Sequence, residues 1–358
     1  MSRRVREVDE EAVRGAIGLH PPVPHLLVCS LLIYSLFALP GKPAPPTTTL
    51  AFVGDVMLGR GVAQSLDGDW DAAFAEVRPW LEGADLAFAN LESPLATALP
   101  PLSSPSTMGG TEGGRYDLRA PPEAVAALRA AGFDIVSLAN NHALDAGNAG
   151  LAQTIAKLNA AGITGLVDWE TNKPTNYQTN KLPNYPTNSP AYRFLAFDDS
   201  VAPLDLEAAA GVVAAAAGQA EVVVVSIHWG GEYQAAPGPR QRAVARALAD
   251  AGAGIIVGHG PHVLQQVEWI EETLVAYSLG NFLFDQPYPV DCRWGAILRV
   301  TLQGDHFVAV EAIPTVAEHG RVRPASPATA AAIHNRIPRS INREPLPSLS
   351  ARRPSGRD

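Results

Sequence analysis

Short apolar runs alternate with amphipathic segments along most of the chain. Strand-length apolar runs occupy residues 50–54, 85–89, 133–138, 221–227 and 254–257, and polar residues follow each of them. Helical spacing of apolar positions occurs between them, at residues 69–81, 121–131, 149–161, 204–217 and 238–251. Strands that alternate with helices in this way are typical of a parallel sheet, so the pattern predicts an α/β fold.

The pattern changes after residue 262. Strand-like runs then follow one another at residues 264–270, 273–279, 296–302 and 307–316, with few helical segments between them. We therefore expect antiparallel strands late in the chain and a mixed sheet. The predicted folded domain covers residues 50–318, and residues 319–358 are predicted to form a largely disordered tail.

One segment inside the predicted domain has no apolar face. Residues 171–190 consist of five tetrads, TNKP, TNYQ, TNKL, PNYP and TNSP. Neither strand nor helix periodicity can bury such a sequence, and prolines interrupt it. We interpret residues 171–190 as a low-complexity insertion without a catalytic role.

The N-terminal region is predicted to carry an export signal. An uncharged apolar run covers residues 26–39, preceded within residues 1–25 by four arginines. Its length fits the core of a signal peptide better than a full membrane span, and the arginines predict a cytoplasmic N-terminal segment. We expect a signal anchor or a cleaved signal peptide, with a buried helix as the remaining alternative. The Pro-rich residues 40–49 then form a tether, and the domain lies on the extracytoplasmic side, membrane-anchored or secreted.

Composition excludes several function classes. The net charge of −9 argues against a general nucleic-acid binder, because an acidic surface repels a polyanion. The chain contains only two cysteines, Cys29 and Cys292. This number excludes a disulfide-stapled scaffold, a cysteine-based zinc module and an iron–sulfur cluster.

Chemistry-bearing side chains gather where the predicted strands end. They are Asp55, Glu92, Asn141, His142, His228, His259 and His262. In α/β sheets the carboxyl ends of the strands form the ligand site, so these residues are expected to converge. Carboxylate, amide and imidazole groups without thiolates suit Mn, Fe or Zn ions. Two or more carboxylate and imidazole clusters at one edge suggest a dinuclear centre, which activates water and holds a phosphoryl group.

Seven segments in order give the chain a family resemblance. They read GDVMLGR (54–60), ANLESPL (89–95), LRAPPE (118–123), SLANNHALDAG (137–147), HWGGEY (228–233), GHGPH (258–262) and YSLGNFLFD (277–285). This set resembles the CapA family of poly-γ-glutamate capsule biosynthesis proteins, which is similar to the calcineurin-like metallophosphoesterases. The resemblance implies a four-layer αββα sandwich with mixed sheets.

The resemblance also implies roles for single residues. The implied metal ligands are Asp55, Glu92, Asn141, His228, His259 and His262. His142 would be the acid or transition-state stabiliser, and Asp145 would orient it, although Asp145 could instead cap the helix that follows. One departure weakens the metal site, because Met57 stands where the phosphoesterases have a histidine ligand. Arg119 and Asn281 are the candidate substrate-binding residues.

The function expected from the resemblance is capsule or exopolymer synthesis. The chain would be a metal-dependent hydrolase or transferase whose substrate is an anionic polymer or another component of the cell envelope. Its partners would be membrane proteins of a capsule synthase. Two alternatives remain open at this point: a general metallophosphoesterase, and a non-catalytic partner that binds the polymer or the synthase on the same fold.

Overall fold

The computed structural model describes residues 46–97, 117–168, 192–338, 341 and 346–349. The predicted N-terminal segments 1–25 and 26–39, most of the tether and the insertion 171–190 lie outside these residues. Within the described part of the chain, no helix is both long and apolar enough to cross a membrane.

The first of two sheets contains most of the strands. Its order is β13-β12-β11-β1-β2-β3-β4, and β10 pairs in parallel with the end of β1. β1 to β4 are mutually parallel, whereas β11, β12 and β13 are antiparallel. The bounds are β1 Thr47–Val56, β2 Leu86–Leu91, β3 Ile135–Ser137, β4 Thr164–Leu166, β10 Asn281–Leu283, β11 Trp294–Gln303, β12 His306–Glu318 and β13 Arg321–Pro324.

The second sheet has the order β5-β6-β7-β9-β8. Only β8 is antiparallel to its neighbour. Its strands are β5 Tyr192–Asp198, β6 Val222–His228, β7 Ile255–His259, β8 Val267–Ile270 and β9 Thr273–Ala276. Every residue of β6 and β7 is buried, as their β-branched sequences require of strands covered on both faces.

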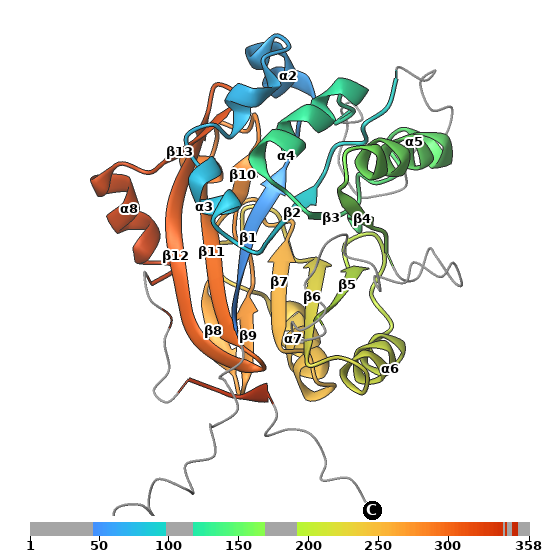
Figure 1. The fold of residues 1–358 in the computed structure, drawn as a ribbon, viewed down its shortest axis with the longest axis vertical. Coiled ribbons are helices and arrows are strands. Elements are labelled where there is room, and N and C mark those ends of the chain that lie inside the picture. Colours follow the sequence, from blue (N-terminus) through green and yellow to red (C-terminus); the bar gives the residue numbers. More distant parts are fainter. Residues whose placement is uncertain (1–45, 98–116, 169–191, 339–340, 342–345, 350–358) are drawn as a thin grey trace, which may run out of the picture. The chain divides into compact units, whose positions relative to one another are not determined.

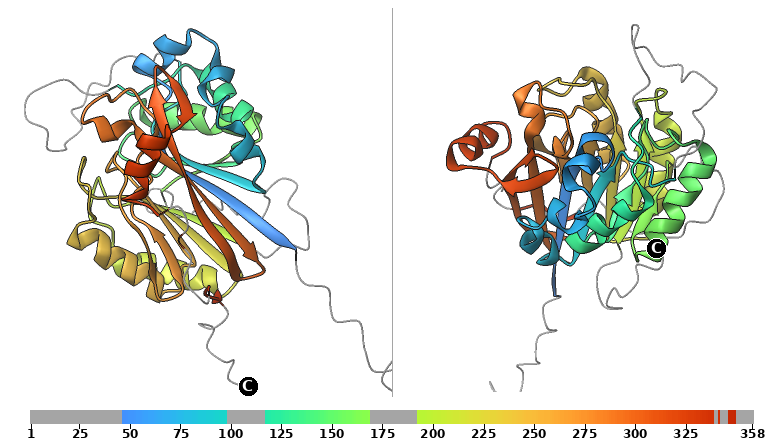
Figure 2. Two further views of the ribbon diagram at one scale, coloured as in Figure 1. Left: turned by 90° about the vertical axis from the view of Figure 1, so that its left-hand side faces the viewer. Right: turned by 90° about the horizontal axis from the view of Figure 1, so that it is seen from above.

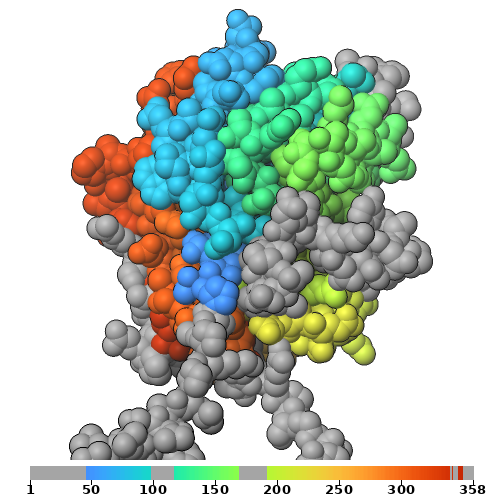
Figure 3. Space-filling model, in the orientation of Figure 1, coloured from blue at the N-terminus to red at the C-terminus, as the bar shows by residue number. Residues whose placement is uncertain are grey.

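Helices cover the outer faces of both sheets (Figure 1). The first sheet is covered by α2 (Arg60–Leu66), α3 (Arg78–Glu82), α4 (Val125–Ala131) and α5 (Gly147–Ala160), which form the surface seen in Figure 3. The second sheet is covered by α6 (Leu206–Ala217) and α7 (Pro239–Asp250). The two sheets face each other in the turned views of Figure 2. The predicted four-layer αββα sandwich is confirmed.

A single apolar layer joins the two sheets. Phe88 on β2 stacks against Phe194 on β5, with ring centroids 6.0 Å apart. Phe52 on β1 packs beside Phe88, and Val224 and Val257 extend the same core from the second sheet. Because these side chains are almost fully buried, the two sheets are held face to face, and their strand ends lie together.

The expectation of a disordered tail is wrong for residues 319–338. β13 adds to the sheet beside β12, and α8 (Pro327–His334) follows it. Ile333, Ile337 and Ile341 are buried and belong to the core between the two sheets. Ile333 lies in α8 and the other two follow the helix, so burial of these side chains orders the segment.

We expect Ile333→Ala to lower the free energy of unfolding by about 2–5 kcal/mol, because it leaves a cavity in a packed core. Ile333 has an exposed fraction of 0%. Urea denaturation of the two proteins measures the difference. An unchanged midpoint would show that the tail does not contribute to the core.

Candidate metal centre

Strand register brings the predicted site residues to one place. Asp55 pairs with Asn90 across β1 and β2, and His228 pairs with His259 across β6 and β7. Each pair lies at the carboxyl end of its sheet, and the arrowheads of these strands point the same way in Figure 1. Because the sheets pack face to face, the two pairs meet across the sandwich.

The side chains form a compact buried cluster. Ligand atoms of Asp55, Glu92 and His262 lie within 4.8 Å of one another. Nδ1 of His262 is 3.2 Å from Oδ2 of Asp55, and Nδ1 of His259 is 3.4 Å from Oδ1. Nδ1 of His228 is 3.7 Å from Oε1 of Glu92. All five residues have exposed fractions of 5% or less, so the groups face one another with little water around them.

Two glycines allow this close approach. A Cβ on Gly54 would lie 1.8 Å from the backbone oxygen of Gly280, where β1 meets β10. Gly260 has a φ of +102°, and a Cβ there would lie 2.9 Å from Nε2 of His228. The glycines of the Gly54-Asp55 and His259-Gly260 pairs therefore have a steric cause.

The pKa values of the two carboxyl groups are shifted in opposite directions. Burial alone would raise the pKa of Asp55, but hydrogen bonds and positive charge from His259 and His262 outweigh burial and hold it well below its ordinary value. Burial and the neighbouring charge of Asp55 raise the pKa of Glu92 well above its ordinary value. Two carboxylates with such different affinities for protons are a feature of functional sites.

The imidazoles also differ from one another. Burial lowers the pKa of His228 to about 3, so its ring is neutral and one ring nitrogen keeps a lone pair that can bind a metal ion. Burial opposes the charged form of His262 too, but the charges of Glu92 and Asp55 outweigh it and raise its pKa to about 9. Without a metal ion, the His262 proton supplies the positive charge between the two carboxylates.

The chemistry of the cluster fits a metal ion. Among the described residues, Oε2 of Glu92 and both ring nitrogens of His259 are buried without a hydrogen-bond partner of good geometry. Buried polar atoms without a partner are costly, and a cation bound by the Glu92 oxygen and one ring nitrogen of His259 would remove part of that cost. Two carboxylates and three imidazoles are ligands that Mn, Fe or Zn accept, and the donor set does not select among these ions.

Metal affinity should rise with pH, because a metal ion must displace the proton that His262 holds up to a pKa of about 9. Release of one proton gives an increase of about tenfold in apparent affinity for each pH unit between 7 and 9. Chelator competition with Mn²⁺ at several pH values measures the slope. An affinity that stays constant over this range would contradict the assigned protonation.

His142 lies beside this cluster, on the loop after β3. Its Nδ1 is 2.9 Å from Oδ2 of Asp145, which fixes the ring and leaves Nε2 for other contacts. This agrees with the orienting role proposed for Asp145, and α5 begins without a side-chain cap. Asn141, predicted as a metal ligand, is exposed, and its amide nitrogen is 3.1 Å from Nε2 of His142.

The two candidate substrate-binding residues lie differently from expectation, and Met57 is buried away from the ligands. Arg119 forms an ion pair with Asp117, with Nε 2.7 Å from Oδ1, so an adjacent carboxylate already offsets its charge. Asn281 is fully buried and its Oδ1 lies 2.9 Å from Nδ1 of His262, which makes it a support for the cluster and not a surface for substrate. Met57 packs in the core beneath the helices, where its sulfur accepts a hydrogen bond from the Gly59 backbone.

Two buried amides were not predicted. Nδ2 of Asn90 lies 2.9 Å from Oδ1 of Asp55 and 3.0 Å from Oε1 of Glu92. Nδ2 of Asn140 lies 3.1 Å from Oδ1 of Asn90. A usable signal was present for Asn90, because residues 90 and 92 lie two apart on an extended segment and face the same side.

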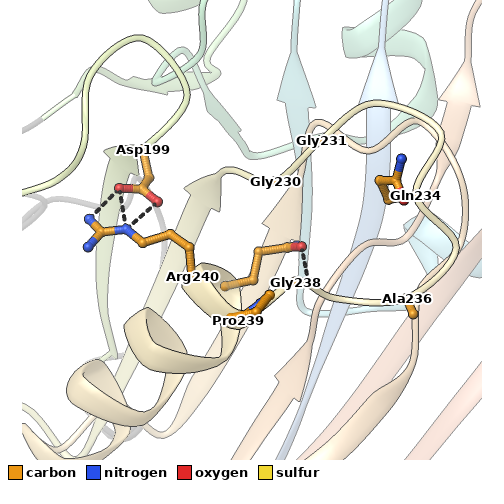
Figure 4. A pocket seen from close by; sticks show the side chains of 9 residues that line it. Asp199, Gly230, Gly231, Gln234, Ala236, Gly238, Pro239 and Arg240 are labelled. Atoms are coloured by element: carbon orange, nitrogen blue, oxygen red, sulfur yellow. Dashed lines mark hydrogen bonds and ion pairs between the residues drawn. The ribbon is translucent and has the colours of Figure 1, made fainter.

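A separate hollow of about 360 Å³ lies at the start of α7 (Figure 4). The loop after β6 lines it, and Arg240 and Asp199 form an ion pair at its side. The side chain of Gln241 accepts a hydrogen bond from the Gly238 backbone and closes the first turn of the helix. These two pairs of polar groups at the hollow are thus bonded to one another, whereas the metal cluster keeps unpartnered atoms on Glu92 and His259.

Known proteins resemble this chain in both sequence and fold. Residues 49–286 match the family described as bacterial capsule synthesis protein PGA_cap. The capsule biosynthesis protein CapA of Bacillus anthracis is 31% identical over 314 residues, covering 83% of this chain and 73% of that protein. The PGA biosynthesis protein CapA of Bacillus subtilis is 33% identical over 254 residues, covering 66% and 63%.

A solved structure shares the fold. The crystal structure of a protein described as a novel phosphatase, from Mycoplasma pneumoniae, aligns with a TM-score of 0.50. The alignment covers 80% of this chain and 97% of that protein at 11% sequence identity. At this identity the likeness concerns the fold alone.

Proposed function

Because the chain belongs to the bacterial capsule synthesis protein PGA_cap family, we propose that it is a metal-dependent phosphoester hydrolase or transferase in the synthesis of a capsule polymer. The Bacillus subtilis relative is named a PGA biosynthesis protein, which supports poly-γ-glutamate as that polymer. One observation carries the catalytic part of the proposal: five buried ligand groups converge where both sheets end, beside the His142–Asp145 pair.

The proposed mechanism divides the work between two groups of residues. Asp55, Glu92, His228, His259 and His262 would hold the metal, which supplies Lewis acidity and an activated water when it is bound. Asp145 accepts a hydrogen bond from Nδ1–H of His142 and stabilises the protonated ring. Nε2 of His142 then donates its proton to the oxygen that leaves. Burial of the cluster excludes bulk water and strengthens each of these interactions.

The substrate and the location belong to the same proposal. The positive charge of a metal ion bound in the cluster would attract an anionic polymer or a phosphorylated precursor in the cell envelope, although the chain as a whole is acidic. The uncharged residues 26–39 after four arginines support an extracytoplasmic domain, membrane-anchored or secreted. The proposed partners are membrane proteins of a capsule synthase.

One observation favours a non-catalytic role. Met57 occupies the position of a phosphoesterase ligand and lies in the core under the helices, bonded to the Gly59 backbone. A site short of one ligand could still bind metal and serve only as a scaffold for the polymer or the synthase. Catalysis and scaffolding differ in their dependence on His142, which does not belong to the buried ligand cluster.

The test combines an activity screen with a capsule assay. The purified chain is loaded with Mn²⁺, Fe²⁺ or Zn²⁺ and assayed on bis(p-nitrophenyl) phosphate. In parallel, a strain lacking its own protein of this family is complemented with the wild type, and its polymer is measured. Metal-dependent hydrolysis together with restored polymer supports the proposal. Restored polymer without hydrolysis on any phosphoester substrate favours the scaffold.

A further inference from the structure

We propose that Asn140 is a positioning residue that acts through Asn90 and sets the His142 loop in register with the metal ligands. This inference rests on the proposed function. Asn140 has an exposed fraction of 4% and Asn90 of 0%, and each joins two parts of the site through its side-chain amide. Their chain of contacts links the loop after β3 to the carboxylates at the ends of β1 and β2.

Backbone groups fix the orientation of the first amide. The backbone oxygen of Leu91 lies 3.0 Å from one atom of the Asn140 amide, and a carbonyl only accepts, so that atom is Nδ2. The backbone N–H of His142 donates to the other atom, at 3.1 Å, which must therefore be Oδ1. Asn140 has no freedom to turn without leaving one of these buried backbone groups unpaired.

The orientation of the Asn140 amide determines that of the Asn90 amide. Nδ2 of Asn140 faces Asn90, so Asn90 must present its oxygen there, at 3.1 Å. Its Nδ2 is thereby turned toward the carboxylates of Asp55 and Glu92, at 2.9 and 3.0 Å. A donor at this point contacts an oxygen of each carboxyl group and holds the two side chains in place. An Asn90 amide turned the other way would set a third oxygen against them.

The neighbouring residues Asn140 and Asn141 therefore have different tasks. Asn141 is exposed and contacts His142 at Nε2, the nitrogen that donates the proton in the proposed mechanism. Asn140 holds the backbone of the same histidine and supports the ligand carboxylates from behind. Groups that orient metal ligands through hydrogen bonds commonly change metal affinity or activity by about 10–100-fold when they are removed.

The experiment measures Mn²⁺ affinity by chelator competition for the full chain and three variants. Asn140→Ala and Asn90→Ala should each weaken binding by about 10–100-fold. The double variant should bind about as weakly as Asn90→Ala alone, because Asn140 acts through Asn90. If the loss of Mn²⁺ affinity in the double variant equals the product of the two single losses, the proposed coupling is overturned. An Asn140→Ala protein with wild-type affinity would overturn it as well.

Activity at saturating Mn²⁺ gives a second readout. The kcat of Asn90→Ala should recover to within about threefold of wild type, because excess metal compensates a weakened site. The kcat of Asn140→Ala should stay at least about tenfold lower, because the His142 loop has also lost its support. Equal recovery of both variants would contradict the link between Asn140 and His142.

Two further variants control for damage to the fold. Thr273 is buried and its hydroxyl bonds to the backbone oxygen of Ala253, away from the cluster. Thr273→Val should lower the thermal midpoint without changing Mn²⁺ affinity. If Asn140→Ala does not fold, Asn140→Ser replaces it and should weaken binding in the same direction. A wild-type chain that binds no Mn²⁺ would overturn the proposed function and this inference together, whereas binding that Asn140 does not influence overturns only the inference.

Discussion

His142→Ala should lower kcat for phosphoester hydrolysis by about 10²–10⁴-fold, the usual contribution of a general acid, while metal content stays near that of the wild type. The reason is the position of His142. Its Nδ1 is bonded to Asp145, it lies on the loop after β3, and it does not belong to the cluster of ligand atoms around Asp55. The measurement is kcat on bis(p-nitrophenyl) phosphate, with metal analysis of the same samples.

The same variant separates catalysis from scaffolding in the cell. In the catalytic account, a strain that carries His142→Ala makes little polymer although the protein is stable and exported. His306→Ala is the matched control, because His306 is an exposed histidine paired with Asp305 on the hairpin between β11 and β12. Normal polymer from a stable His142→Ala protein would contradict the enzymatic proposal and favour the binding role.

His259→Ala should reduce metal affinity by more than the 10–100-fold typical of supporting residues, and we expect a loss of about 100-fold or greater. His259 is 1% exposed, and neither of its ring nitrogens has a hydrogen-bond partner of good geometry among the described residues. Removing the ring therefore takes away a proposed ligand, and it also removes the contact of Nδ1 with Oδ1 of Asp55, at 3.4 Å. Chelator competition and metal analysis give the affinity.

The packing that is lost with the His259 ring needs a separate control. The His259 ring stacks on Phe88, with centroids 6.4 Å apart, so its loss also leaves a space in the core. His259→Phe fills much of that space without a ligand atom, and it should bind metal as weakly as His259→Ala. Strong metal binding by His259→Phe would show that His259 is a packing residue and that the ligand set is smaller.

The architecture was largely predictable because long periodic segments carry their own signal. The apolar run 221–227 and the amphipathic run 238–251 correspond to β6 and α7. The predicted helix at 69–81 is wrong: a 3₁₀ turn, Trp70–Ala73, precedes the short α3. Pro79 lies in the first turn of α3, where a missing N–H is tolerated, and Phe74 is fixed between them by stacking on Phe282.

Elements whose existence depends on tertiary contacts were missed. β4 and β10 have three residues each, too few for a period, and they are strands only because a neighbouring strand pairs with them. α8 follows a Ser326 cap but has a weak apolar face, and burial of Ile333 against the sheets stabilises it. Such segments contain too little local information to be distinguished from a tail.

Part of the site was predictable, because some of its residues directly follow periodic apolar runs. Asp55 and His228 follow apolar runs, so their place at the carboxyl ends of strands could be inferred, and the CapA resemblance that their motifs carry is confirmed. Which of the neighbours Asn140 and Asn141 faces inward depends on the loop conformation after β3. A spacing argument cannot distinguish two identical adjacent residues, and the buried network is visible only in three dimensions.

Metal analysis of the purified full chain is the most direct test of the central claim that the buried cluster is a metal centre. The chain is loaded with a mixture of Mn²⁺, Fe²⁺ and Zn²⁺, desalted and analysed beside Asp55→Ala, which lacks the carboxylate that both His259 and His262 contact. We expect about one ion per chain or more in the wild type and about a tenth of that in the variant. A wild-type chain without metal, or equal metal in both proteins, would contradict the account.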